Sequence, residues 1–119
     1  MAIWSDEEGS PDAPLVALIH GTMDRSTGML RLSRRLDDRF RVLRYDRRGY
    51  GRSVAADGSH RGPFDMASQV GDLVELLRDR PAVLIGHSFG GDVALATAVG
   101  HPELVAGIAI YETPLSWEP

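Results

Sequence analysis

The sequence predicts an α/β fold built around a mainly parallel β-sheet. Short apolar runs such as LVALI and AVLI show no alternation of apolar and polar residues, which is typical of strands covered on both faces. Segments with apolar residues at helical spacing separate these runs. Strands that alternate with helices imply right-handed crossover units and therefore a parallel sheet. We expect about four strands flanked by about three helices.

The chain divides into a polar N-terminal segment and one domain. Residues 1–14 are acidic and rich in turn-forming residues, and Ser5 to Pro14 is expected to be a loop that leads into the domain. Residues 15–119 are expected to form a partial α/β domain without a linker or a repeat. The expected strands are residues 15–20, 41–45, 82–86 and 106–111, and the expected helices begin near Ser26 or Thr27, at Asp65 and at Phe89.

The clearest helix follows Asp65, because Val70, Leu73, Val74 and Leu77 repeat at the spacing of one helical face. The four strands are expected to lie in the order second, first, third, fourth across the sheet. The fourth strand, with the sequence AGIAIY, then lies at an edge and leaves its backbone groups unpaired. Such an edge invites association with a second copy or with a complementing chain.

Composition excludes several classes of function. The 119 residues carry a net charge of −4, which argues against nucleic acid as a partner. The chain has no cysteine, so disulfides, thiolate metal sites and a cysteine nucleophile are excluded. No apolar stretch approaches the roughly 18 residues of a membrane span, and the acidic N-terminus is unlike a signal peptide. We expect a soluble cytoplasmic protein.

The strongest chemical signal is the segment Gly86-His87-Ser88-Phe89-Gly90, which matches the pattern G-x-S-x-G. It lies between an expected strand and an expected helix, where a nucleophile elbow belongs. Such an elbow holds the serine in a strained backbone conformation, and side chains two residues before or after it would collide, which explains both glycines. The first amides of the following helix then face developing negative charge. The alternative is a tight turn without chemistry.

A second signal, His20-Gly21-Thr22-Met23, directly follows the first expected strand. The end of that strand lies on the edge of a parallel sheet at which ligands bind. The amide of Thr22, with that of Met23 as the alternative, is expected to form an oxyanion hole together with the amide of Phe89. The imidazole of His20 is expected to be buried and to order this loop through hydrogen bonds.

Together with the turn DRRGYGRS after the second strand, these motifs resemble the α/β-hydrolase superfamily, in its cofactor-independent esterase, lipase and peroxidase-like branch. The resemblance implies that Ser88 attacks the carbonyl of a small acyl substrate. The oxyanion would rest on the amides of Phe89 and Thr22, and an acyl-enzyme would be hydrolysed, with no cofactor and no metal. Serine at this position argues against the dehalogenase and epoxide-hydrolase branches, which usually carry aspartate there.

The chain departs from the family in its missing catalytic partners, because the family places an acid and then a histidine after the serine. His101 would lie at the far end of the helix that starts at Phe89, roughly 18 Å from Ser88. His87 is expected to point away from Ser88, and His60 lies in a polar loop and is a weak candidate for the base. Glu112 follows the fourth strand, where some relatives place the acid, and is expected to be a carboxylate on the pocket rim.

Two classes of function therefore remain open. The first is a serine hydrolase that is weak or inactive as this isolated chain, which ends near the point where many relatives insert a lid. The second is a non-catalytic scaffold that pairs through its exposed sheet edge, as a homo-oligomer or with a complementing chain. A small-molecule-binding module without turnover is a third possibility that no motif specifically supports.

Overall fold

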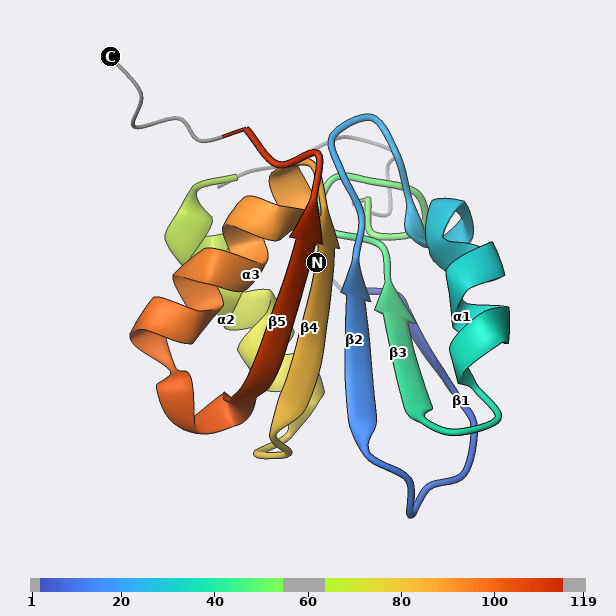
Figure 1. The fold of residues 1–119 in the computed structure, drawn as a ribbon. Coiled ribbons are helices and arrows are strands. Elements are labelled where there is room, and N and C mark those ends of the chain that lie inside the picture. The colour runs from blue at the N-terminus through green and yellow to red at the C-terminus, as the bar shows by residue number, and fades with distance from the viewer. Residues whose placement is uncertain (1–2, 55–63, 115–119) are drawn as a thin grey trace.

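The computed structural model describes residues 3–54 and 64–114 and shows a five-stranded sheet with helices on both faces (Figure 1). The strands are β1 (Ser5–Glu8), β2 (Leu15–Ile19), β3 (Arg41–Tyr45), β4 (Ala82–His87) and β5 (Val105–Tyr111). The helices are α1 (Leu30–Leu36), α2 (Met66–Leu77) and α3 (Phe89–Gly100), with short 3-10 turns at η1 (Ser26–Met29) and η2 (Pro102–Leu104).

The sheet has the order β1-β3-β2-β4-β5, and β2 to β5 are parallel. The predicted order of the four parallel strands is confirmed. α2 and α3 cover one face and α1 covers part of the other, as Figure 1 shows. All five residues of the central strand β2 are buried. This double covering explains why its sequence is continuously apolar.

The fifth strand, β1, corrects the expected N-terminal loop. Ser5–Glu8 pairs antiparallel with β3, although the segment has no apolar alternation. Ion pairs hold it in place: Glu7 contacts Arg41 at 3.1 Å and Arg80 at 2.9 Å, and Asp6 contacts Arg44 at 3.3 Å. Because charged pairs replace the apolar pattern at this edge, the strand has the composition of a loop.

The helix termini agree with the sequence at Asp65 and differ at Ser26. The Asp65 carboxylate accepts a hydrogen bond from the Ser68 amide at 2.8 Å and caps α2. The amide of Ser26 instead donates to Asp46 Oδ1 at 2.7 Å, and neither Ser26 nor Thr27 caps a helix with its side chain. The chain therefore passes through a 3-10 turn before α1 begins at Leu30.

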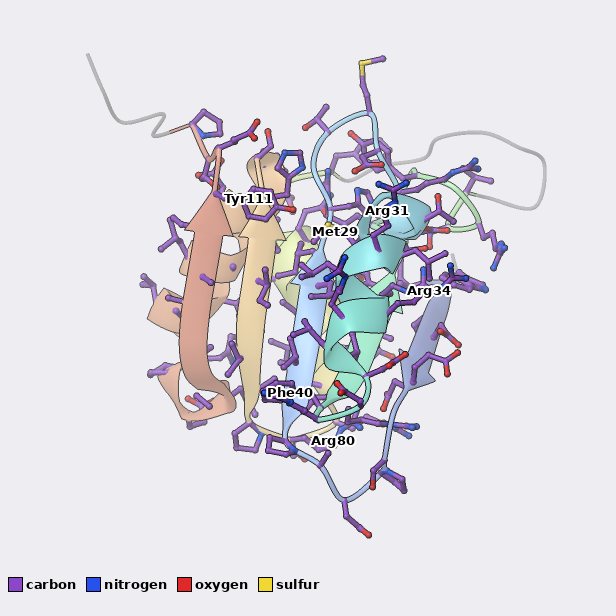
Figure 2. All side chains as sticks on the ribbon, turned by 45° about the vertical axis from the view of Figure 1, so that its right-hand side comes forward. Met29, Arg31, Arg34, Phe40, Arg80 and Tyr111 are labelled. Atoms are coloured by element: carbon purple, nitrogen blue, oxygen red, sulfur yellow. The ribbon has the colours of Figure 1, made fainter. Side chains whose placement is uncertain are left out.

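The loops that follow the parallel strands meet at one edge of the sheet, at the top of Figure 1. Figure 2 shows Tyr111 near this edge, whereas Phe40 and Arg80 lie at the opposite one. The candidate site residues of the sequence therefore gather at the first edge, and the Glu7 ion pairs stabilise the second. No helix in the described parts of the chain combines the length and the apolar character needed to cross a membrane.

Candidate active site

Ser88 occupies the sharp turn between β4 and α3. Its backbone angles are φ 54° and ψ −124°, a conformation that residues other than glycine rarely adopt. The amide of Ser88 donates to the carbonyl of Tyr111 at 3.0 Å, and the carbonyl of Ser88 accepts from the amide of Gly91 at 2.9 Å. Hydrogen bonds to a neighbouring strand and to the next helix therefore hold the strained residue in place.

The two glycines of the G-x-S-x-G pattern are required by close backbone contacts. A Cβ atom on Gly86 would lie 2.5 Å from the carbonyl oxygen of Gly90, and one on Gly90 would collide with the carbonyl oxygen of Ile19. Both contacts involve backbone atoms, which cannot move aside as a flexible side chain can. The backbone of the elbow is therefore in close contact with the end of β2, and its two glycines are in close contact with each other.

The loop after β2 lies directly against the nucleophile. A Cβ atom on Gly21 would be 3.0 Å from Cβ of Ser88, which is tighter than most contacts of real Cβ atoms. Thr22 and Met23 follow on the surface, and Met23 has φ 60°. Phe89 is the first residue of α3, so its amide has no acceptor within the helix. The structure thus brings together the segments that carry the predicted oxyanion amides.

His20 is fully buried and makes two hydrogen bonds with its ring. Nε2 accepts from the amide of Arg47 at 2.9 Å, which leaves the proton on Nδ1 to be donated to the carbonyl of Gly21 at 2.8 Å. Burial lowers the pKa of His20 below its usual value, which favours the neutral ring. The ring therefore orders the loop that carries Thr22 and is not available to accept a proton from Ser88.

Arg47 extends this buried network to the wall of a cavity. Its Nε donates to the carbonyl of His20 at 2.9 Å, and its Nη1 donates to Gln69 Oε1 at 3.3 Å. The guanidinium carbon lies 4.7 Å from the ring centre of Tyr50 and 5.0 Å from that of Phe89. The guanidinium therefore contacts both the turn after β3 and the elbow.

The cavity has a volume of about 450 Å³, which suits a small molecule. Its wall includes two glycines of the turn after β3 and, with them, Thr22, Arg47, Tyr50, Phe64, Gln69 and Phe89. Two of these, Thr22 and Phe89, carry predicted oxyanion amides, and Phe89 directly follows Ser88 in the chain. The sequence reasoning did not assign Arg47, Tyr50, Phe64 or Gln69 to the site. Two features could have pointed to these residues. Gln69 is a polar residue on the helix α2, where it is buried, and residues 47 and 50 lie between the fixed positions of the DRRGYGRS turn.

On the other side of Ser88 the contacts are longer. The rings of His87 and Tyr111 are stacked at 4.7 Å, and His87 Nε2 lies 3.8 Å from Glu112 Oε2, whose side chain is 80% exposed. The Tyr111 hydroxyl lies 3.7 Å from the sulfur of Met29, and Figure 2 shows these two side chains at the same edge of the sheet. Glu112 thus lies at the edge where the sequence places it, with φ 53°.

No described residue supplies a base to Ser88. His101 follows the last residue of α3, twelve residues along the helix, and its Nδ1 faces Glu103 at 3.7 Å. None of the hydrogen bonds among the described residues joins the Ser88 hydroxyl to a histidine. His60, the other histidine considered, lies outside the described residues. Within residues 3–54 and 64–114, no three histidine or acidic side chains are placed to share a metal ion.

Comparison with known proteins places this arrangement in a family. The sequence profile of the alpha/beta hydrolase fold matches residues 14–119. A 2-(acetamidomethylene)succinate hydrolase of Mesorhizobium japonicum is 34% identical over 109 residues, which are 91% of this chain and 38% of that protein. Epoxide hydrolase 4 of Mus musculus is 30% identical over 107 residues, which are 89% of this chain and 30% of that protein.

A solved structure of a hydrolase from Pseudomonas aeruginosa superposes on 93% of this chain with a TM-score of 0.85 and 30% sequence identity. The match covers 42% of that chain, so the present chain spans less than half the length of each of these relatives. The mostly parallel sheet and the profile match over residues 14–119 agree. The chain belongs to the α/β-hydrolase family.

Proposed function

We propose that Ser88 is the nucleophile of a serine hydrolase that acts on an ester or a related acyl compound. The observation that carries the proposal is the strained turn, in which Ser88 has φ 54° and is packed between two backbone contacts that only glycine permits. Strain of this kind concentrates at functional sites. The relatives named as hydrolases support the reaction class. Serine in place of aspartate favours acyl chemistry over epoxide opening.

In the proposed reaction, the Ser88 hydroxyl oxygen attacks the carbonyl carbon and its proton passes to a general base. The amides of Phe89 and Thr22, or of Met23 in place of Thr22, stabilise the oxyanion. The acyl group is transferred to Ser88 as the leaving group departs with a proton, and water then hydrolyses the acyl-enzyme. No described residue fills the role of base or of its acid partner, and we expect this chain alone to turn over slowly.

A fluorophosphonate probe tests the nucleophile directly, because it phosphonylates an activated serine without needing the natural substrate. The chain is incubated with the probe and its intact mass is measured, beside a Ser88→Ala variant whose fold is checked by circular dichroism. We expect a mass increase in the native chain that is absent in the variant. Labelling that persists in Ser88→Ala would contradict the proposal. A folded native chain that never reacts would favour the second candidate below.

The second candidate is a scaffold that pairs through β5. This strand lies at the edge of the sheet and exposes Ile108, Ile110 and Tyr111 by 40%, 38% and 42%. An exposed apolar edge strand is a template for pairing with another chain. Light scattering after gel filtration is expected to show an oligomer that Ile108→Lys dissociates. Val99→Lys, at a residue of α3 that is 84% exposed, is the control, and a monomeric native chain would exclude self-pairing.

A further inference from the structure

The cavity beside the elbow contains a cation, Arg47, that forms no ion pair with any residue the structure describes. Arg47 is 1% exposed, and its Nη2 has no hydrogen-bond partner among the described residues. Its Nε and Nη1 are used by His20 and Gln69, which are neutral acceptors. No carboxylate of the described residues forms an ion pair with it, whereas Arg41, Arg44, Arg48 and Arg80 each pair with an acidic side chain.

A buried guanidinium without an anion is costly, so its retention calls for a reason. Burial lowers the pKa of Arg47, and Tyr45, Tyr50 and the more distant carboxylate of Asp24 counter this effect only in part. The ring of Tyr50 at 4.7 Å and the ring of Phe89 at 5.0 Å contribute cation–π attraction. The two N–H groups of Nη2, which are buried, have no acceptor among residues 3–54 and 64–114.

The position of this cation relative to the elbow is specific. Arg47 lines the same cavity as Thr22 and Phe89, whose amides are the proposed oxyanion donors. A carbonyl carbon held by these amides would therefore have its acyl portion in the cavity, near the guanidinium. Because the guanidinium is already desolvated in the folded chain, an anion that enters the cavity meets it without the screening of bulk water.

We propose that Arg47 is the anion-recognition group of this cavity and that the acyl compound attacked by Ser88 carries a carboxylate. The proposal rests on the proposed function for the reacting carbonyl, but the binding of the anion does not depend on an activated serine. The substrate class is thus a small acyl compound with a free carboxylate a few bonds from the reacting carbonyl. The two N–H groups of Nη2 can donate hydrogen bonds to the oxygens of such a carboxylate.

The test uses two small molecules of nearly identical shape, succinamate and succinamide, which differ in one carboxylate against one amide. Each is titrated into the isotope-labelled native chain and into Ser88→Ala, and amide chemical shifts give the dissociation constants. We expect succinamate to bind about 10- to 100-fold more tightly than succinamide, as a hydrogen bond to a charged group implies. The shifts are expected at Thr22, Tyr50 and Phe89.

Substitution of Arg47 provides the second arm. Arg47→Met is expected to reduce the preference for succinamate to within about twofold, and Arg47→Lys, which keeps the charge, to retain part of it. Arg52→Met is the matched control, because Arg52 lies in the same turn, is exposed, and stacks on Trp4 at 4.3 Å rather than lining the cavity. The control is expected to keep the native preference.

Equal affinity for the two molecules, absence of binding to the native chain, or a preference that Arg52→Met abolishes and Arg47→Met preserves would each overturn the proposal. If Arg47→Met does not fold, the native titration still decides, because it needs no variant. Fluorophosphonate labelling tests Ser88 and needs no anion, whereas this titration tests the cavity and needs no reactive serine. The failure of one proposal is therefore distinguishable from the failure of the other.

Discussion

The two sides of Ser88 are built differently. On one side, His20 and Arg47 are buried, and three of their hydrogen bonds measure 2.8–2.9 Å. On the other side, His87 and Glu112 are partly or largely exposed, and His87 Nε2 lies 3.8 Å from Glu112 Oε2. Fixed dipoles are preorganised on the first side, where the oxyanion and the acyl group are proposed to lie. The second side is the more open of the two, because its side chains are partly or largely exposed.

The largest expected effect tests the packing of the buried side. Gly90→Ala would force a Cβ atom into the carbonyl oxygen of Ile19 at the end of β2, and we expect a loss of about 3–5 kcal/mol in the free energy of unfolding. Gly71→Ala is the matched control, because nothing lies within 4 Å of its Cβ position in α2. The control is expected to stabilise the chain by up to about 1 kcal/mol. Denaturant titration measures both. Equal stabilities would show that the elbow is not packed against β2.

The two histidines beside the elbow sharpen the comparison. His20→Ala would leave the amide of Arg47 and the carbonyl of Gly21 buried without partners and would also create a cavity, so we expect a loss of about 2–4 kcal/mol. His87→Ala removes a stacked ring that is partly exposed, and we expect a loss below about 1 kcal/mol. Both values come from denaturant titration. A larger loss of stability in His87→Ala than in His20→Ala would contradict the view that the His20 side of the elbow is the more tightly held one.

A pH dependence is expected from the buried side. The folded-state pKa of His20 lies below its unfolded value, so between these values the unfolded chain binds the proton and the folded chain does not. Stability therefore falls as pH decreases from about 6.5, with a slope of at most about 1.4 kcal/mol per pH unit for this one group. His20→Asn keeps a donor to Gly21 and cannot titrate.

Denaturant titrations of the native chain and of His20→Asn from about pH 8.5 to pH 5 measure this slope. We expect the difference in stability between the two proteins to shrink as the pH falls. A constant difference over the whole range would show that His20 becomes protonated as readily in the folded chain as in the unfolded one. Parallel curves above pH 7.5 are the internal control, because His20 is neutral in both states there.

Sequence patterns were sufficient for the parallel part of the fold. Continuous apolar runs predicted β2 and β4, and the Asp65 cap with the spacing after it predicted α2, because these elements follow local periodicity and capping. β1 was missed because its stability comes from ion pairs with Arg41, Arg44 and Arg80, which are distant in sequence. The sequence of residues 5–8 does not by itself indicate which arginines will lie beside it.

The candidate site likewise has one part that the sequence predicted and one part that it did not. The elbow was predictable because a local motif encodes the strained turn and its glycines. The cavity was not, because its wall combines residues from four separate segments, among them Gln69 on α2 and Arg47 in the turn after β3. That no described carboxylate pairs with Arg47 is a property of the packed structure. It follows from what surrounds the side chain in space and has no signature in the sequence.

The smallest expected effect belongs to the open side. Glu112 has an 80% exposed side chain and lies 3.8 Å from His87, a geometry in which ion pairs contribute little. We expect Glu112→Gln to change the free energy of unfolding by less than about 0.5 kcal/mol and the rate of fluorophosphonate labelling by less than about twofold. Ser88→Ala is the unreactive control that sets the background of the labelling assay. A labelling rate that fell tenfold or more in a stably folded Glu112→Gln would mean that this carboxylate helps to activate Ser88. The open side would then already hold part of the catalytic machinery.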